Sequence, residues 1–340
     1  MLRNIDVYLW DVEVISTDQL FSIKSDVDFE RLALAVYQYQ ASENPVYSEF
    51  VRILEIDINQ VKNIAQIPFL PIELFKSQTI ICGTSEPEIV FSSSGTTGII
   101  QSKHHVKQLA VYTESFRKGF EFFYGNISEY TILALLPSYQ ERDGSSLIFM
   151  VDDLIKESNN PSSGYFLYNH DELYTVLLRQ KAEKRKTILL GVTYALLDFI
   201  EAHTIINFPE LIVMETGGMK GKRKELVKEE LHELLCNGFG VENIHSEYGM
   251  TELLSQGYSA GKGIFKTPPW MRVLVRDTND PFSLLGTGKS GGLNIIDLAN
   301  IYSCSFIATQ DLGRKQPDGG FEVLGRFDNS DIRGCNLLVQ

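Results

Sequence analysis

Apolar and polar positions follow different spacings along the chain and predict different elements. Residues 1–80 carry helix-spaced apolar positions, for example in Asp28–Tyr39 and Val46–Ile56. Short apolar runs bounded by polar turns then predict strands at Glu88–Ser92, Thr131–Leu136, Thr187–Val192 and Leu211–Glu215. Amphipathic stretches predict helices at Gln108–Phe123, Ser145–Glu157, Tyr194–His203 and Glu225–Cys236. Alternation of strand and helix is typical of an α/β domain with a largely parallel sheet.

From about residue 263 the pattern changes to Gly-rich, strand-like segments, which predict a smaller and more antiparallel β subdomain. These segments are Met271–Arg276, Gly292–Ile296, Ser303–Ala308 and Phe321–Gly325. We therefore divide the chain into a helical and α/β nucleotide-binding part over 1–262, a β-rich subdomain over 263–326, and a short tail over 327–340.

Composition narrows the class of protein. A chain of 340 residues with 44% hydrophobic residues can bury a large core without disulfides. The formal net charge of −13 argues against nucleic-acid binding, and the basic run Lys220–Lys224 reads as a solvated helix start. Four cysteines without a C-x-x-C pair argue against a metal or disulfide framework. Acidic residues near the N-terminus argue against a signal peptide, and no run is long enough for a membrane span, so we expect a cytoplasmic protein.

A segment rich in hydroxyl groups and glycine directly follows a predicted strand. It reads Phe-Ser-Ser-Ser-Gly-Thr-Thr-Gly over 91–98. Gly95 and Gly98 permit the positive φ angles and close backbone approach that a phosphate cradle needs. No lysine directly follows the last glycine, so the segment is not the G-x-x-x-x-G-K-[ST] loop. Alone, it fits a phosphate-binding loop or a surface turn equally well.

A second segment, His-Ser-Glu-Tyr-Gly-Met-Thr-Glu over 245–252, combines an aromatic ring with a carboxylate. Tyr248 can present its face to a purine, and Glu252 can hold a magnesium ion that also contacts phosphate. The alternative is a loop that ends in a helix start capped by Thr251.

A third segment, Thr-Gln-Asp-Leu-Gly-Arg over 309–314, is followed by Leu-Gly-Arg-Phe-Asp over 324–328. Asp311, at the end of a strand-like run, can accept hydrogen bonds from both hydroxyls of a ribose. Arg326 can reach a ribose or a phosphate. Each piece alone fits a β-turn equally well.

Together, these segments resemble the ordered motifs of the adenylate-forming superfamily, which includes acyl-CoA synthetases, firefly-type luciferases and peptide-synthetase adenylation domains. The resemblance covers about residues 88–335 and implies the N-terminal-domain fold of that superfamily, with ATP and Mg²⁺ as cofactors. It implies that Tyr248 lies against adenine, that Glu252 binds Mg²⁺, and that Asp311 binds the ribose. The residues implied to bind the nucleotide are Ser93, Ser94, Gly95, Thr96, Thr97, Gly98, Lys103, Gly217, Gly218, Met219, Tyr248, Gly249, Met250, Thr251, Asp311 and Arg326.

Departures from the superfamily pattern point to one subfamily. Lys103 substitutes for the lysine that usually follows the phosphate loop, and Gln310 replaces a glycine of the third motif. The sequence ends five residues after Cys335, so we expect the usual C-terminal domain to be absent. The ending Asp-Ile-Arg-Gly-Cys-Asn-Leu-Leu-Val over 331–339 is similar to that of the LuxE-type acyl-protein synthetases. That resemblance implies that Cys335 accepts the acyl group, whereas the alternative is a small buried hydrophobe.

The function expected from the sequence is ATP-dependent activation of a carboxylic acid, expected to be fatty, and its transfer to a thiol. Glu252, Thr96 and Cys335 are the predicted catalytic residues. The expected partners are the acid and an acyl-accepting protein or reductase. Two alternatives stay open: an acyl- or aryl-CoA ligase of the phenylacetate type, and a non-catalytic protein that binds nucleotide and docks to a partner.

Overall fold

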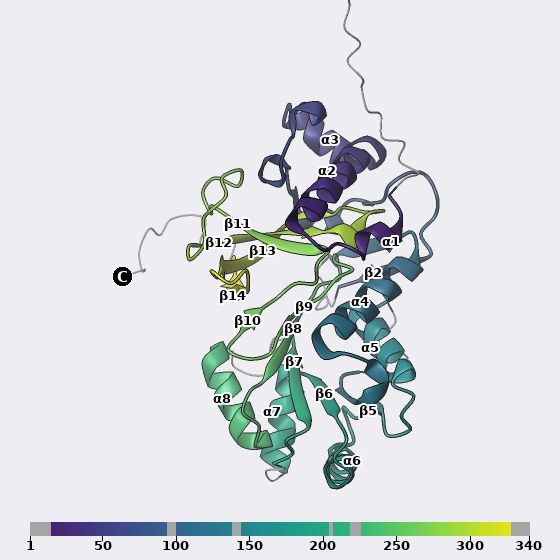
Figure 1. Cartoon of the computed structure of the whole chain (residues 1–340), viewed down its shortest axis with the longest axis vertical. Coiled ribbons are helices and arrows are strands. Elements are labelled where there is room, and N and C mark those ends of the chain that lie inside the picture. Colours follow the sequence, from purple (N-terminus) through teal and green to yellow (C-terminus); the bar gives the residue numbers. More distant parts are fainter. Residues whose placement is uncertain (1–14, 94–99, 138–143, 204–206, 218–225, 328–340) are drawn as a thin grey trace, which may run out of the picture.

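The computed structural model describes residues 15–93, 100–137, 144–203, 207–217 and 226–327. Two six-stranded sheets organise this part of the chain, one largely parallel and one largely antiparallel. They lie toward opposite ends of the molecule (Figure 1). Among the described residues, no helix combines the length and the apolar character that crossing a bilayer requires.

The parallel sheet has the strand order β5-β4-β6-β7-β8-β9, and only β9 runs antiparallel to its neighbour. Every residue of β4 and β6 is buried, as expected where helices cover both faces of a parallel sheet. The strands are β4 (Thr131–Leu135), β5 (Gly164–Tyr165), β6 (Thr187–Val192), β7 (Leu211–Thr216), β8 (His245–Tyr248) and β9 (Gly257–Ser259).

Helices connect these strands and cover them. They are α5 (Ser146–Glu157), α6 (His170–Ala182), α7 (Thr193–Ala202) and α8 (Lys228–Phe239). The side chain of Ser145 caps the start of α5, and Gly240, with a φ of 69°, ends α8 in the left-handed conformation that glycine adopts without strain. α4 and α5 lie on one side of the sheet, and α7 and α8 lie on the other (Figure 1).

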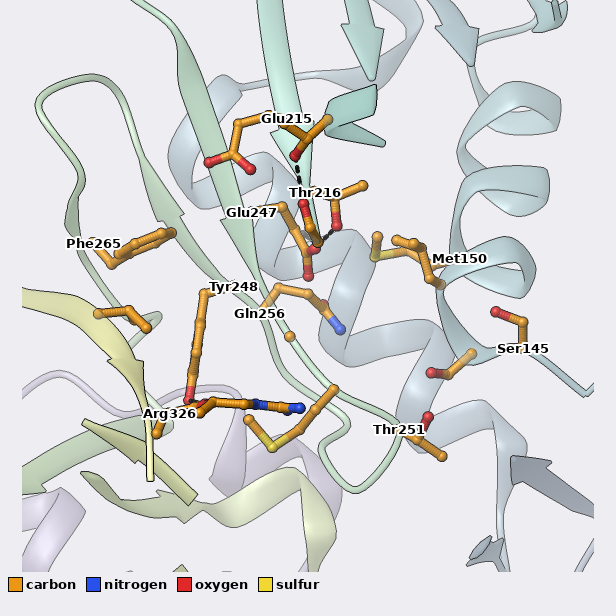
Figure 2. Close-up of a pocket in the computed structure, with 18 of the residues that line it drawn as sticks. Ser145, Met150, Glu215, Thr216, Glu247, Tyr248, Thr251, Gln256, Phe265 and Arg326 are labelled. Carbon is orange, nitrogen blue, oxygen red and sulfur yellow. Dashed lines mark hydrogen bonds and ion pairs between the residues drawn. The ribbon is translucent and has the colours of Figure 1, made fainter. Parts of the chain in front are cut away.

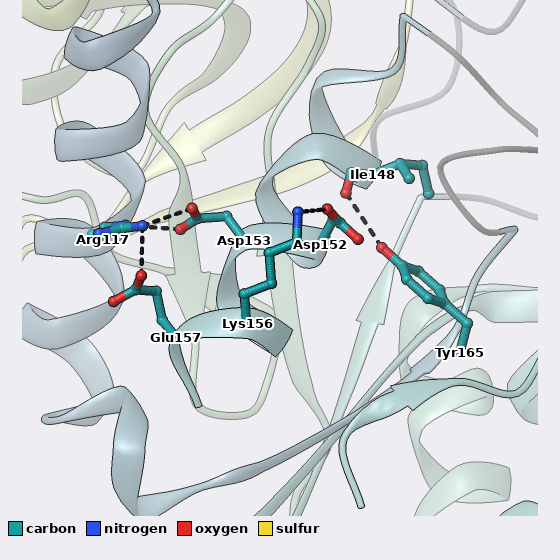
Figure 3. A network of polar contacts seen from close by, with 7 residues as sticks. All are labelled: Arg117, Ile148, Asp152, Asp153, Lys156, Glu157 and Tyr165. Atoms are coloured by element: carbon teal, nitrogen blue, oxygen red, sulfur yellow. Dashed lines mark hydrogen bonds and ion pairs between the residues drawn. The ribbon is translucent and has the colours of Figure 1, made fainter. Parts of the chain in front are cut away.

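A hairpin and a helix precede this sheet in the sequence. β2 (Ile89–Ser92) pairs antiparallel with β3 (Lys103–Val106), and α4 (Leu109–Tyr124) follows. Arg117 of α4 binds Asp153 of α5 through two hydrogen bonds of 2.8 and 2.7 Å, and it contacts Glu157 at 2.8 Å (Figure 3). This bidentate pairing fixes the two helices relative to each other.

The antiparallel sheet has the order β10-β14-β13-β12-β11, and β1 pairs with β13 in parallel. Its strands are β1 (Leu70–Pro71), β10 (Ile264–Phe265), β11 (Met271–Arg276), β12 (Ser290–Asp297), β13 (Phe306–Lys315) and β14 (Phe321–Arg326). Three helices lie at this end: α1 (Thr17–Leu20), α2 (Asp26–Glu43) and α3 (Pro45–Ile53). The buried Gln40 of α2 donates to the carbonyls of Asn300 and Ile301, both at 2.9 Å, and so holds the helix to the sheet.

Short 3₁₀ turns complete the connections. They are η2 (Ile58–Gln60), η3 (Ile64–Gln66), η4 (Ile72–Lys76), η5 (Ile127–Glu129) and η7 (Leu298–Asn300).

The sequence predicted most of the long elements, and two of its strands, β6 and β11, have the predicted ends. The prediction that Asp311 lies at the end of a strand-like run, or in a β-turn, is wrong. β13 begins at Phe306 rather than Ser303 and continues to Lys315, so Asp311 lies within a paired strand and not at its end or in a turn. No helix begins at Thr251, where a turn follows β8. α8 begins at Lys228 rather than Glu225, a residue outside the described part of the chain.

Candidate functional site

A cavity of about 670 Å³ opens at the carboxyl ends of the parallel strands. Its lining includes Ser145 after β4, Thr193 after β6, Gly217 after β7 and Gly249 after β8. Residues of β13 and β14 close the cavity from the other sheet (Figure 2). In open α/β sheets, ligands bind in the crevice outside the carboxyl ends of the strands.

Tyr248, Asp311 and Arg326 form the polar cluster at one side of this cavity. The Tyr248 hydroxyl donates to Asp311 Oδ2 at 2.8 Å, and Arg326 Nε donates to Asp311 Oδ1 at 3.1 Å. Burial, followed by the charge of Asp311, raises the pKa of Tyr248 well above its usual value, so the phenol keeps its proton and remains a donor. A carboxylate has about four acceptor positions, so Asp311 retains capacity for two further hydroxyl donors.

The pairing of β13 with β14 creates the Asp311–Arg326 contact, because these residues are register partners. The Tyr248 ring packs edge-on against Phe321, with ring centroids 5.4 Å apart. One side of the phenol therefore rests on the antiparallel sheet, while its backbone belongs to the parallel sheet. The three residues predicted from separate motifs thus meet in one cavity.

Loop residues predicted to bind nucleotide also line the cavity. They are Gly217, Gly249, Met250 and Thr251. Gly217 has a φ of 68°, and Thr193 Oγ1 donates to its carbonyl at 2.6 Å, which holds the loop after β7. Gly249 lies so close to the Glu247 side chain that a Cβ there would clash with Glu247 Oε1.

Ser93 directly follows β2 and Lys103 is the first residue of β3, and neither residue lines the cavity. The Ser93 N–H donates to the carbonyl of Ser102 at 3.0 Å, and the Ser102 N–H donates to Ser93 Oγ at 3.0 Å. Lys103 pairs with Ser92, which does line the cavity, and its side chain is exposed. Ser92, the last residue of β2, therefore places the start of the predicted phosphate loop at the cavity, and residues 94–99 of that loop lie outside the described part of the chain.

Glu252 is buried directly after Thr251 and is not among the residues that line the cavity. Burial raises the pKa of Glu252, and a hydrogen bond with Ser102 acts in the opposite direction. Asn300 Nδ2 donates to the Glu252 carbonyl at 2.8 Å, and a ring nitrogen of His104 contacts the Thr251 carbonyl at 2.9 Å. These two contacts hold the backbone of the turn at Thr251 and Glu252 in place.

The donor types near Thr251 fit a magnesium ion. Mg²⁺ prefers oxygen ligands and is bound by one or two carboxylates together with substrate phosphates. Thr251 supplies a hydroxyl at the edge of the cavity, whereas Glu252 has the right carboxylate chemistry but does not line the cavity, so its role as a metal ligand stays a prediction. Within the described ranges, no three His, Cys, Asp or Glu side chains are grouped so that they could hold a metal ion by themselves.

Two further buried carboxylates, Glu215 and Glu247, line the cavity from neighbouring strands. Glu215 Oε1 lies 3.0 Å from Lys228 Nζ and 3.6 Å from His232 Nε2, both on α8. Burial raises the pKa of Glu215, but His232, Lys228 and Ser246 together outweigh it and hold that pKa below its usual value.

Glu247 has a different environment. Its Oε2 accepts a hydrogen bond of 2.6 Å from Thr216 Oγ1, and no cation of the described residues pairs with it. Burial is the largest influence and raises the pKa of Glu247 to about 7, with the Thr216 hydrogen bond opposing it and the charge of Glu215 adding to it. Gln256, 7% exposed, lies beside Glu247 in the cavity (Figure 2).

Several predicted residues lie outside the described part of the chain and stay predictions. They are Ser94, Gly95, Thr96, Thr97, Gly98, Gly218, Met219 and Cys335.

Sequence reasoning missed Glu247, Gln256 and Thr216 as cavity residues. The one available signal was a glutamate immediately before the aromatic residue of the second motif. A charged residue at a predicted ligand-binding segment is a candidate even when it is not part of the motif.

Comparison with known proteins identifies both the family and the fold. The family model described as the acyl-protein synthetase LuxE matches residues 14–340. No match was found among curated proteins.

Two solved structures are informative about the fold. A 2-hydroxyisobutyryl-CoA ligase in the postadenylation state with 2-HIB-AMP has a TM-score of 0.63 and 11% identity, covering 97% of this chain and 73% of the ligase. ATP-bound MatB from Rhodopseudomonas palustris has a TM-score of 0.55 and 16% identity, covering 72% of this chain and 49% of MatB. The matched region therefore spans about half of MatB. At these identities the likeness shows the α/β fold of adenylate-forming enzymes and no more.

Proposed function

We propose that this chain, which belongs to the acyl-protein synthetase (LuxE) family, activates a carboxylic acid with ATP and passes the acyl group to a thiol. The observation that carries the proposal is the convergence of Tyr248, Asp311 and Arg326 on one cavity at the carboxyl ends of β7 and β8. The conclusion does not depend on any single motif, because these residues come from three separate segments.

Each residue of the cluster has a task that its environment supports. Asp311 accepts the two ribose hydroxyls with the lone pairs that Tyr248 and Arg326 leave unused. Arg326, whose side chain is 75% exposed, can turn toward the phosphates. Tyr248 and the glycine after it border the adenine, and the loop at Gly217 borders it from β7.

The reaction then follows from charge. The substrate carboxylate attacks the α-phosphate of ATP, a bond forms between them, and pyrophosphate leaves with the electron pair of the broken bond. The hydroxyl-rich segment over 93–98 and Thr96 in particular would donate hydrogen bonds to the developing charge. Mg²⁺ bound at Glu252 would supply electrostatic stabilisation of the same charge.

A thiol then captures the acyl group and AMP leaves. Cys335 is the proposed acceptor, and the three described cysteines are poorly suited to the task. Burial raises the pKa of Cys82 to about 12 and raises the pKa values of Cys304 and Cys236. A thiol must ionise to attack, so these three are weak nucleophiles at neutral pH.

Mass spectrometry of the intact protein tests the proposal. After incubation with ATP, Mg²⁺ and a panel of acids, we expect a covalent acyl adduct that hydroxylamine removes. Cys335→Ser should still release pyrophosphate in the first turnover and should carry no adduct, whereas the matched variant Cys236→Ser should label normally. An adduct that persists on Cys335→Ser would place the acceptor elsewhere. Formation of acyl-CoA without any adduct would replace the thiol-transfer step with a CoA ligase reaction.

A further inference from the structure

Two buried polar side chains in the cavity have hydrogen-bonding capacity that the described residues leave unused. Glu247 accepts one hydrogen bond, from Thr216 to Oε2, and no described residue donates to its Oε1. The carboxamide of Gln256 forms no hydrogen bond with another described residue, although the side chain is 7% exposed. Neither Glu247 nor Gln256 has an atom among the described polar atoms that are wholly buried without a partner, so the unused groups face the cavity. A ligand that displaces water from this side of the cavity must supply their hydrogen bonds.

The alternation of side chains along β8 separates this pair from the polar cluster. Tyr248 and Glu247 are consecutive residues, and consecutive side chains of a strand point to opposite faces. Tyr248 reaches toward Asp311 and Arg326, whereas Glu247 lies on the side of the cavity that Met150 of α5 lines (Figure 2). Thr216, the register partner of Glu247, hydrogen-bonds it on the same side. ATP, by the proposed function, occupies the Tyr248 side, which leaves the Glu247 side for the acid.

No described residue places a positive charge against Glu247. Lys228 and His232 contact Glu215 on the other face, at 3.0 and 3.6 Å. The cavity side of Glu247 also contains Met150 and Tyr112, which offer apolar and aromatic contact. A ligand that satisfies this environment therefore combines an apolar part with at least one O–H or N–H donor.

We propose that the acid carries a hydroxyl or amino group, and that Glu247 and Gln256 bind that group. This inference rests on the proposed function and replaces the fatty acid expected from the resemblance. Glu247 Oε1 accepts the hydrogen bond, and the Gln256 carboxamide can donate to the hydroxyl oxygen or accept from it. An unsubstituted fatty acid has no donor along its chain, so it would leave both groups unpaired inside the protein.

Acid-dependent pyrophosphate release, measured with acids matched in carbon number, tests the inference. Each set contains an unsubstituted acid, its hydroxy derivative and its amino derivative, so the assay also distinguishes the two donor types. We expect kcat/KM to favour one substituted acid over the unsubstituted acid by about tenfold or more. Glu247→Gln and Gln256→Leu should each bring this ratio toward one. The control Glu121→Gln, an exposed carboxylate on α4, should leave it unchanged.

Three outcomes would overturn the inference. A preference for the unsubstituted acid that neither variant changes would do so while leaving acid activation intact. An increase in the KM for ATP rather than for the acid would assign Glu247 and Gln256 to the nucleotide. If no acid releases pyrophosphate, the proposed function fails, and calorimetry with the same acids decides the inference separately. Binding of a substituted acid that Glu247→Gln weakens would support it, and no binding would overturn it.

Discussion

The two faces of the parallel sheet each carry a buried glutamate at the ends of β7 and β8, but the two glutamates have different hydrogen-bonding and ion-pair partners. Glu215 has Lys228 and His232 beside it, whereas Glu247 has one hydroxyl, from Thr216. Within the described part of the chain, two cations lie beside the first carboxylate and none lies beside the second. A buried carboxylate with its own cations acts as part of the framework, and one without them is a candidate for ligand binding.

The pKa shifts of the two groups have opposite signs, and so do their effects on stability. The folded-state pKa of Glu215 is lowered, so its stabilisation is present above its unfolded pKa of about 4.5 and is lost as the pH falls through the folded value. The pKa of Glu247 is raised from 4.5 to about 7, so stability is lost as the pH rises through that interval. Variants at the two positions therefore give opposite pH profiles.

The largest expected effect on activity comes from a third buried carboxylate, Glu252. Glu252→Gln should lower pyrophosphate release by about a thousandfold or more with every acid, because one metal-binding carboxylate is lost. Single-turnover pyrophosphate measurements check this, and circular dichroism checks that the variant folds. Loss with one class of acid alone, or nearly full activity, would show that Glu252 acts in acid recognition or not at all.

Glu247→Gln should stabilise the protein at pH 8. Removing a carboxyl group whose pKa rises from 4.5 to about 7 on folding should raise the free energy of unfolding by about 3 kcal/mol above pH 7. The gain should vanish below about pH 4.5, where the carboxyl is protonated in both states. Urea unfolding at pH 4.5, 6 and 8 measures it. An equal effect at all three values would mean that Glu247 is not desolvated in the folded protein.

Glu215→Gln should have the opposite sign. It removes the charge that faces Lys228 and His232, and we expect a loss of about 2 kcal/mol at pH 7, less than for a wholly buried pair because Lys228 is partly exposed. The loss should shrink in acid, as the glutamate of the wild-type protein becomes protonated. The same urea series checks it. A stabilising effect at neutral pH would contradict the distinction between the two faces.

The smallest expected effect is on nucleotide affinity. Asp311→Asn should weaken ATP binding by about tenfold, because the amide replaces one charged acceptor of the ribose hydroxyls. The preference among acids should stay as in the wild-type protein, because Asp311 lies on the Tyr248 side. Calorimetric titration with ATP and the matched acid panel measure the two effects separately. A change in acid preference would join the two sides into one site.

Local pattern explains why some elements could be predicted and others could not. β6 is a continuous apolar run between polar turns, and its prediction is confirmed at both ends. β8 reads His-Ser-Glu-Tyr, which has no apolar pattern, and it is a strand because β7 and β9 pair with it. The sequence pattern did not predict α6, although its first turn is acidic and its last turn basic, as is typical of a helix.

The candidate site divides in the same way. The resemblance predicted Tyr248, Asp311 and Arg326 because each belongs to a recurring motif, and their meeting in one cavity is observed. Glu247 lies in the second segment but has no role in the motif, Gln256 lies outside all the segments, and the role of both depends on which groups lack a hydrogen-bond partner. Which side chains lack a partner is defined only in the folded chain, where strand alternation and burial decide which groups face the cavity.

The hydrogen bond from Tyr248 to Asp311 joins residues 63 positions apart and belonging to the two different sheets. A nucleotide bound at this pair would therefore contact both sheets and link them for as long as it stays bound. Its binding free energy adds to the resistance of both sheets against coming apart, by RT ln(1 + [L]/Kd) when only the folded chain binds. In limited proteolysis, ATP should accordingly slow cleavage in the regions of both sheets to a similar degree. Removal of ATP should make both regions more susceptible to cleavage.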